Sequence, residues 1–465
     1  MSIEQQSENS TSPPAACPVS GQRGNVCPVP HGPKGLPLIG DAGPYFRDPL
    51  GYTLDTQQRY GPMVGVKLPV PFIQVTEPDA IERVLRTNPD NYVRGKLYRG
   101  FAPYMGRGLL TLDTAEWKTH RRVVQPAFTP QRTRNDAVET ITATSAVLDR
   151  WAELAHRGEP VDIADDVMSI SARVIGAAVV GRDLSKPETG YSEAAAIASK
   201  VMYTKTVFGI NELLPKALPT RYHRERRWAH QKIDAIVRDA VTSRGRTGDT
   251  GDDPAGRLLG SDLSDQGVAD SLRTLLLAGS DTTGQAMIWT LYELARHPGE
   301  RRVVEEEVDR VLAGNPPTID DVDRLPAVAA AVDEALRLYP PVWQFPRDSI
   351  ADDTVAGRFV PGGTTLLMSV YGTHRSAELW TDPNAFDPAR FRTATTSRHR
   401  YAYLPFGGGR RMCIGKALAL ATCVLAVAMI SQRFRLRLVR HDIRPGTYIT
   451  LFPTGGVPAY LEERS

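Results

Sequence analysis

The sequence predicts a mainly α-helical protein, with a large helical part and a smaller β-rich portion, and three observations indicate this class. A helical pattern of apolar residues runs over residues 265–297, which at 1.5 Å per residue makes a helix about 50 Å long. Apolar residues alternate on both sides of the turn Pro69-Val-Pro71, as expected for a strand hairpin. Beyond Tyr339, short strand patterns alternate with segments rich in Pro and Gly up to Gly409.

The other elements are predicted in chain order from local patterns. Residues 64–68 and Phe72–Val75 form the hairpin, and a helix begins at Pro78, because proline favours the first helical turn. From Thr114 onward the pattern is mostly helical. The Gly- and Asp-rich residues 244–256 predict a mobile surface loop before the long helix.

The composition is that of an ordinary globular protein. Of the 465 residues 41% are hydrophobic and 23% charged, and the formal net charge of +3 favours no nucleic-acid partner. The four cysteines, Cys17, Cys27, Cys413 and Cys423, are too few for a disulfide scaffold and suit a reducing compartment. We therefore expect a cytoplasmic protein, a monomer that binds no nucleic acid.

Two units are predicted along the chain. Residues 1–30 have low hydrophobicity and predict a disordered tail. A Cys-Pro-Val sequence occurs twice in the tail, at Cys17 and Cys27; the pair could form a metal or disulfide site, but a solvated tail is favoured. Residues 31–465 form one domain. We expect no membrane anchor, because the longest apolar run, residues 417–430, is too short to span a bilayer and predicts a buried helix.

The most informative segment is Phe406-Gly-Gly-Gly-Arg-Arg-Met-Cys-Ile-Gly-Lys416. Three glycines cost backbone entropy, which indicates a close backbone approach. Cys413 precedes an apolar helix, whose free N–H groups and dipole stabilise a thiolate, and Gly415 leaves space for a flat macrocycle against the sulfur. A phosphate-binding loop is excluded, because Gly409 and Gly415 enclose five residues and Ala417 stands where a hydroxyl is needed.

This segment resembles the ligand loop of the cytochrome P450 family, F-x-x-G-x-R-x-C-x-G. The matching residues are Phe406, Gly409, Arg411, Cys413 and Gly415. The resemblance implies the cytochrome P450 fold and a haem b whose iron is bound by the Cys413 thiolate. It also implies that Arg411 contacts a haem propionate and that Phe406 and Gly415 belong to the cofactor site. A thiolate ligand pushes electron density onto the iron and favours O–O cleavage. Cys423, inside the apolar run, is predicted as a core residue.

The long helix carries Ala278-Gly-Ser-Asp-Thr-Thr283. The Thr282 hydroxyl can bond back to the Ala278 carbonyl, and Gly279 permits a local bulge, a defect frequent at functional positions. The stretch resembles the family's oxygen-binding helix, A-G-x-[DE]-T-T. The resemblance implies that Asp281 and Thr282 are the catalytic acid and alcohol that relay protons to the oxygen-binding site.

A charged pair is predicted at Glu334-Ala-Leu-Arg337, where opposite charges stand at i and i+3 among apolar residues. It matches the family's E-x-x-R motif, and Phe386-Asp-Pro-Ala-Arg-Phe391 resembles the segment that supplies a third member, Arg390. The resemblance makes this triad a structural clamp for the ligand loop, with no direct part in the chemistry.

Two further segments resemble the family's propionate sites. Trp117 and Arg121 stand one helical turn apart, where an indole N–H and a guanidinium can bind one carboxylate, and they match W-x-x-x-R. Arg347 follows Arg337 by ten residues, where the family usually has another propionate-binding arginine. His120 falls outside this spacing and is left unassigned.

The resemblance implies a haem-thiolate monooxygenase that inserts one oxygen atom of dioxygen into an apolar small molecule. Two electrons must come from a separate ferredoxin or flavodoxin with its reductase. Two segments are expected on the Cys413 side of the haem, and each carries two cations. These cations would steer an acidic partner toward the haem; they are Lys118, Arg122, Arg410 and Lys416. Two alternatives stay open: a haem-thiolate enzyme without oxygen insertion (a peroxygenase, an isomerase or an oxidative coupling enzyme), and a non-catalytic haem binder or gas sensor, for which no output module is seen.

The substrate is predicted only as a class: a terpene, a fatty acid, a polyketide or an aromatic peptide, of the kind made in secondary metabolism. Candidates for the substrate pocket are taken by position, and they are Phe101, Tyr104, Leu109, Ala278, Val342, Ile449 and Thr450. The segment Val342-Trp-Gln-Phe345, which in the family lines the substrate pocket, is bulkier than the family pattern suggests.

Overall fold

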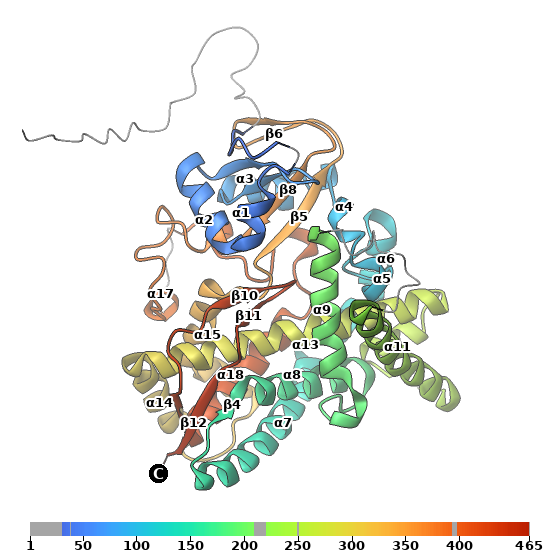
Figure 1. The fold of residues 1–465 in the computed structure, drawn as a ribbon. Helices are drawn as coiled ribbons and strands as arrows, with labels where there is room; N and C mark the ends of the chain where they lie inside the picture. The colour runs from blue at the N-terminus through green and yellow to red at the C-terminus, as the bar shows by residue number, and fades with distance from the viewer. Residues whose placement is uncertain (1–29, 38, 209–219, 249–250, 393–397, 465) are drawn as a thin grey trace, which may run out of the picture.

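The computed structural model describes residues 30–37, 39–208, 220–248, 251–392 and 398–464. Apart from Pro30, the predicted tail lies outside the described residues, and so do Cys17 and Cys27. The described chain is mainly helical with smaller sheets, which confirms the predicted fold class (Figure 1).

The helices up to the long central one form the first part of the fold. They are α1 (Ala42–Arg47), α2 (Pro49–Tyr60), α3 (Pro78–Glu82), α4 (Gly95–Tyr98), α5 (Ala102–Met105), α6 (Thr114–Val124), α7 (Pro130–Arg157), α8 (Ile163–Val180), α9 (Tyr191–Phe208), α11 (Arg221–Thr247) and α12 (Pro254–Leu259). Many of them begin at a proline, whose fixed φ suits a first turn and whose missing N–H costs nothing there.

The second part begins with the central helix. Its helices are α13 (Asp265–Arg296), α14 (Pro298–Leu312), α15 (Pro326–Leu338), α16 (Val370–Thr373), α17 (Ala389–Arg392) and α18 (Lys416–Arg433). Short 3-10 and π turns connect them and the earlier helices: η1 (Arg83–Thr87), η2 (Pro89–Asn91), η3 (Gln125–Phe128), η4 (Pro187–Thr189), η5 (Ile319–Arg324), η6 (Arg400–Ala402) and η7 (Gly409–Arg411).

The largest sheet lies at one end of the molecule, beside α1, α2 and α3 and above α13 in Figure 1. Its strands, in spatial order, are β1 (Met63–Val66), β2 (Phe72–Val75), β8 (Thr365–Ser369), β5 (Gln344–Ser349) and β3 (Tyr92–Val93). The predicted hairpin is confirmed, because β1 pairs antiparallel with β2. Only the β2–β8 pairing within this sheet is parallel.

Three smaller sheets complete the β portion. The strands are β4 (Val161–Asp162), β12 (Pro458–Glu463) and β9 (Phe434–Leu438) in one sheet, β10 (Pro445–Thr447) and β11 (Leu451–Pro453) in a second, and β6 (Asp353–Val355) and β7 (Arg358–Val360) in a third. The turn between β10 and β11 brings residues 448–450 toward the central helix, since the Thr450 hydroxyl bonds a side chain of α13.

The central helix α13 crosses the whole helical part (Figure 1). It begins where predicted, with the Ser264 side chain accepting the N–H of Gly267 as an N-cap. Leu272 and Leu276 belong to one hydrophobic core, and Met287 to another. Between them, most of residues 278–283 are only partly buried, because they face a cavity.

The helix α18 confirms the predicted buried helix after Cys413. It packs against α7 and α13, and Cys423 lies within the core. Among the described helices α18 is the one long and apolar enough to cross a membrane, and 67% of it is buried inside the fold.

The loop predicted over residues 244–256 is shorter than expected. The helix α11 continues to Thr247, and α12 already begins at Pro254. The Asp253 side chain caps α12 by accepting the Gly256 N–H at 2.8 Å and also accepts the Arg244 guanidinium at 2.7 Å. Local composition predicted a loop here, but this cap and ion pair extend both helices.

The predicted triad is present and joins α15 to the segment before α17. Glu334 and Arg337 are fully buried, and two bonds of 2.7 Å join them. Arg337 also donates to the carbonyls of His374 at 2.8 Å and Pro383 at 2.6 Å. Arg390 lies 3.3 Å from the Glu334 carboxylate.

A buried histidine continues this clamp to the ligand loop. His374 Nδ1 lies 3.1 Å from the Arg337 carbonyl, and its Nε2 accepts the Leu404 N–H at 3.0 Å. Burial lowers the pKa of His374 to about 3, so the neutral ring donates through one nitrogen and accepts through the other. Leu404 stands two residues before Phe406, so the triad positions the ligand loop through backbone contacts.

We predict that Glu334→Gln and Arg337→Leu each yield little cofactor-loaded protein. Each variant leaves one charge of a fully buried pair without its partner, at a cost of roughly 3–5 kcal/mol. Purified yield and haem content measure the effect. Asp55→Asn is the control, because it breaks an exposed pair with Arg59, which should contribute at most about 1 kcal/mol. Normal haem content in both buried-pair variants would show that the clamp is dispensable.

Candidate active site

A cavity of about 310 Å³ lies between α13 and the segment that carries Cys413. Its walls come from α8, α9, α13, α18, the segment after α4 and the turn before β11. Most of its lining side chains are apolar, among them Leu109, Ala278, Val342 and Ile449. Such a cavity is suited to an apolar molecule held against a few polar groups.

The Cys413 thiol opens onto this cavity. The Cys413 N–H donates to the Phe406 carbonyl at 3.0 Å, which closes the loop. Gly409 has φ +65°, and a Cβ there would stand 2.0 Å from the Leu85 carbonyl oxygen, so only glycine fits. The predicted close backbone approach therefore occurs between Gly409 of the loop and Leu85 of η1.

The electrostatics of Cys413 are mixed. Burial raises the pKa of the thiol, while the Gly415 N–H and the cations Arg121 and Lys416 act to lower it. A metal ion that binds a thiol deprotonates it outright. The thiolate that the resemblance implies thus depends on an iron, with support from the helix amino terminus. Cys423 differs: burial raises its pKa to about 12.

Three arginines meet at one end of the cavity, and their charges indicate what binds there. Arg94, Arg347 and Arg411 line it. Burial, with repulsion from Arg94, lowers the pKa of Arg347 to about 10, and burial with repulsion from both neighbours lowers that of Arg411 to about 9. Asp113, which accepts from Arg411 at 3.2 Å, is the carboxylate paired with them.

This cluster fits a haem. Three guanidiniums beside one carboxylate leave two positive charges uncompensated in a buried place, which is costly without counter-charges. A haem carries two propionates, and arginine binds carboxylates in a bidentate way. Together with the Cys413 sulfur and the glycine-rich loop that also line the cavity, the residues present suit this cofactor.

Of the residues predicted to bind the propionates, Trp117 contacts the three-arginine cluster and Arg121 does not. The Arg411 guanidinium lies over the Trp117 ring, with its Cζ atom 4.4 Å from the centre of the ring. Arg121 lines the cavity, but it donates to the Met412 carbonyl at 3.2 Å, next to Cys413 and apart from the three-arginine cluster. Arg94 also belongs to this cluster, although no sequence motif includes it.

The middle of α13 supplies the polar groups of the opposite wall. Thr282 donates to the Ala278 carbonyl at 2.8 Å, as predicted. The helix is continuous through Gly279, so the bulge that this glycine would permit does not form. A Cβ at Gly279 would meet Ile175 at 2.4 Å, which shows that glycine serves close packing with α8.

Asp281 and Thr282 both line the cavity but do not bond each other in this structure. Asp281 accepts from Thr450 at 2.6 Å and from Gln285 at 3.3 Å. Burial raises the pKa of Asp281, and these two neutral donors lower it in part. The carboxyl group is thus held without a paired cation.

Five of the predicted pocket residues line the cavity, and two do not. The five are Leu109, Ala278, Val342, Ile449 and Thr450. Phe101 packs edge-on against Tyr98, with ring centres 5.3 Å apart, and Tyr104 is buried beside His230. Placing Phe101 and Tyr104 at the wall was wrong, because the short helix α5 turns Met105 toward the cavity instead.

Other lining residues had no motif to indicate them. They include Tyr98, Leu110, Ile175, Ala195, Ser199 and Met202. Those of α8 and α9 reach the cavity only through the packing of these helices on α13.

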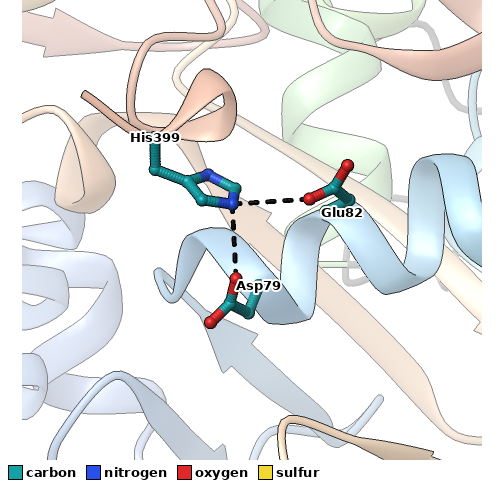
Figure 2. Close-up of side chains that lie close together, drawn as sticks. All are labelled: Asp79, Glu82 and His399. Atoms are coloured by element: carbon teal, nitrogen blue, oxygen red, sulfur yellow. Dashed lines mark ion pairs between the residues drawn. The ribbon is translucent and has the colours of Figure 1, made fainter. Parts of the chain in front are cut away.

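A separate group of possible metal ligands lies on the surface (Figure 2). His399 Nε2 stands 3.3 Å from Asp79 and 3.4 Å from Glu82. His399 Nδ1 accepts the Tyr401 N–H at 3.1 Å, so the neutral ring carries its proton on Nε2 and donates to the carboxylates. No ring nitrogen then offers a lone pair to a metal, and the group acts as a clamp between α3 and η6.

Comparison with known proteins gives consistent results. A family model described as Cytochrome P450 matches residues 30–455. The chain is 33% identical to "Cyclooctatin synthase" of Streptomyces melanosporofaciens, over 90% of this chain and 91% of that protein. It is 32% identical to "Cyclooctat-9-en-7-ol 5-monooxygenase" of the same organism, over 89% of this chain and 90% of that protein.

A solved structure, "Crystal structure of cytochrome P450DA heme domain", has the same fold. The TM-score is 0.82, and the match covers 95% of this chain and 98% of that chain. The sequence identity is 24%, so this likeness concerns the fold alone.

We predict that Cys413→Ser abolishes thiolate ligation of the haem, whereas Cys423→Ser preserves it. Both cysteines border the cavity, but Cys413 is exposed to it, whereas Cys423 is 1% exposed within the core. The measurement is the carbon monoxide difference spectrum of the reduced protein. A red-shifted Soret band retained in Cys413→Ser would contradict the assignment.

Proposed function

Since the chain belongs to the cytochrome P450 family and is a haem b monooxygenase, we propose that it inserts one oxygen atom of dioxygen into an apolar small molecule of terpene type. The observation that supports this most is the cavity, whose apolar walls surround a few polar groups beside Cys413. One relative is named for an alcohol with a hydrocarbon skeleton, cyclooctat-9-en-7-ol. An apolar cavity binds such a skeleton by excluding water from it.

Different residues of this chain have different proposed roles in the reaction. A thiolate-bound haem supplies oxygen activation, because the thiolate favours O–O cleavage. Arg94, Arg347 and Arg411 would hold its propionates, and Cys413 its iron. The apolar wall keeps the substrate dry and oriented, so that one position of its skeleton meets the reacting oxygen.

Thr282 is proposed to order a water molecule. Its O–H is committed to the Ala278 carbonyl, so its oxygen lone pairs accept a hydrogen bond from water. That water then directs its second O–H into the cavity. Asp281, whose pKa burial raises, can take up and release the proton that the water passes on. Thr450 holds the Asp281 carboxyl at the edge of the cavity between transfers.

We also propose how electrons arrive. The chain uses a redox partner, and ferredoxin or flavodoxin with its reductase suits the exposed cations Lys118, Arg122 and Lys416. Arg410 is exposed as well, but it pairs with Asp90 at 2.5 Å. A cytoplasmic monomer, with residues 31–465 as its haem domain and residues 1–30 as a tail, completes the proposal.

A substrate screen tests the proposed substrate class. Terpene alcohols, fatty acids, polyketides and aromatic peptides are titrated into the ferric protein, and conversion of the haem from low to high spin is recorded. We expect the largest conversion with terpene-type compounds, followed by a product one oxygen atom heavier in turnover. Conversion and product with another class alone would overturn the terpene assignment and leave the monooxygenase assignment intact.

We predict that Thr282→Ala leaves haem binding unchanged but uncouples turnover. Loss of the ordered water should lower product formation by about 10²–10⁴-fold, while reductant use continues and peroxide rises. Thr290→Ala is the matched control: Thr290 makes the same bond to the carbonyl four residues earlier, at 2.7 Å, within the core. Equal coupling in both variants would contradict the role of Thr282.

We predict that reversing Lys118 and Lys416 to Glu slows first-electron transfer from an acidic partner at low salt. Exposed charges steer association and are screened over about 8–10 Å at physiological salt, so rising salt should slow the parent as well. Substrate binding should stay unchanged. The control reverses Lys186 and Lys200, two exposed lysines that lie just before η4 and on α9. Parent rates in the first double variant would place the docking face elsewhere.

A further inference from the structure

The segment of residues 102–112 forms one wall of the cavity through Met105, Leu109 and Leu110. It comprises α5 and the turn that follows, and it lies beside the amino-terminal part of α13. Beyond α5 the backbone of this wall is irregular, so its position relative to α13 depends on the contacts between the two.

A buried carboxylate on α13 holds this wall. Asp270 accepts the backbone N–H of Arg107 through Oδ2 at 2.6 Å. Its Oδ1 accepts from Gln266 at 2.7 Å and from Arg273 at 2.6 Å. One oxygen thus serves the wall and the other serves the side chains of α13. Asp270 is only 4% exposed, so water cannot replace these bonds.

Close packing confirms that the wall is pressed on the helix. Gly106 has φ +66°, and a Cβ there would stand 2.1 Å from Asp270 Cγ. A Cβ at Gly108 would meet Thr274 Oγ1 at 2.2 Å. Thr274 in turn donates to the Met105 carbonyl at 2.8 Å. Two glycines and two polar side chains therefore join the wall to α13.

The contact extends to a second element of the cavity. Arg273 donates to Asp234 of α11 at 2.9 and 2.5 Å, and His230 Nδ1 lies 2.8 Å from the other Asp234 oxygen. The helix α11 packs on α9, which contributes Met202 to the cavity. Asp270 and Arg273 thus connect two sides of the substrate space.

We propose that Asp270 is a positioning residue that sets the size of the substrate cavity by fixing the wall of residues 102–112 against α13. This inference rests on the proposed function, in which the cavity is the substrate site. Only a carboxylate serves here, because both of its oxygens accept. An amide at this position presents one donor, which must face either the Arg107 N–H or the Arg273 guanidinium.

The experiment compares ligands of different size in Asp270→Asn. Imidazole, 1-phenylimidazole and a bulky triaryl imidazole are titrated into the ferric protein, and their dissociation constants are read from the shift of the Soret band. With the wall released, the affinity for the triaryl compound relative to 1-phenylimidazole should rise by at least about tenfold. The affinity for imidazole, which needs little of the wall, should change by less than about twofold. Amide exchange should accelerate in residues 105–112.

A second variant and a control make the result specific. Gly106→Ala should separate the wall from α13 by a change in the wall itself, because the added methyl group collides with Asp270. It should shift the ligand preference in the same direction as Asp270→Asn. Glu116→Gln breaks the exposed pair between Glu116 and the Arg107 side chain, at 2.6 Å, without touching Asp270. It should leave all three affinities unchanged.

The outcomes separate this inference from the proposed function. A parent protein without a thiolate-type carbon monoxide spectrum would overturn the function itself. A normal parent, with unchanged ligand preference in Asp270→Asn and in Gly106→Ala, would overturn the positioning role, even if both variants are less stable. If Asp270→Asn binds no haem, the ligand preference of Gly106→Ala decides: a shift supports the proposal, and parent values overturn it.

Discussion

The geometry of the site depends on the buried ion pair between Glu334 and Arg337. Removing two charges from water is expensive, and the cost is offset only when the remaining donors and acceptors are also used. Arg337 meets this condition with carbonyls of the segment before α17, and His374 extends the network to Leu404. The ligand loop is therefore fixed through its backbone, with no side chain of the clamp among the residues that line the cavity.

A second constraint is the charge that the fold leaves uncompensated. Burial lowers the pKa values of Arg347 and Arg411, and repulsion from Arg94 lowers both further. A ligand that binds only the folded chain stabilises it. Haem with its propionates is such a ligand, so cofactor binding and folding should be coupled at these arginines.

Local patterns were enough to predict the fold class, the long helix and the buried helix after Cys413, because periodicity and capping act within a few residues. Spaced motifs likewise indicated Cys413, Thr282 and Glu334. Arg94 and His374 could not be predicted, since their roles arise from contacts with Arg411 and Leu404, far away in the sequence. Phe101 and Tyr104 were misplaced because one turn of helix decides which side chain faces the cavity.

The helix α13 carries two proposed functions at separate places: Asp270 positions the wall of the substrate cavity, and Thr282 takes part in proton transfer. Asp270 and Thr282 are twelve residues apart, about 18 Å along the axis. The stretch between them includes Leu272 and Leu276, which are fully buried in one hydrophobic core. The bond from Thr282 to the Ala278 carbonyl lies within one turn of α13, so it depends on the helix itself and not on the position of the wall. In the proposed mechanism, the wall of residues 102–112 can therefore shift to admit another substrate while Thr282 keeps its bond to Ala278, so that one scaffold accepts different skeletons and retains the proposed proton relay.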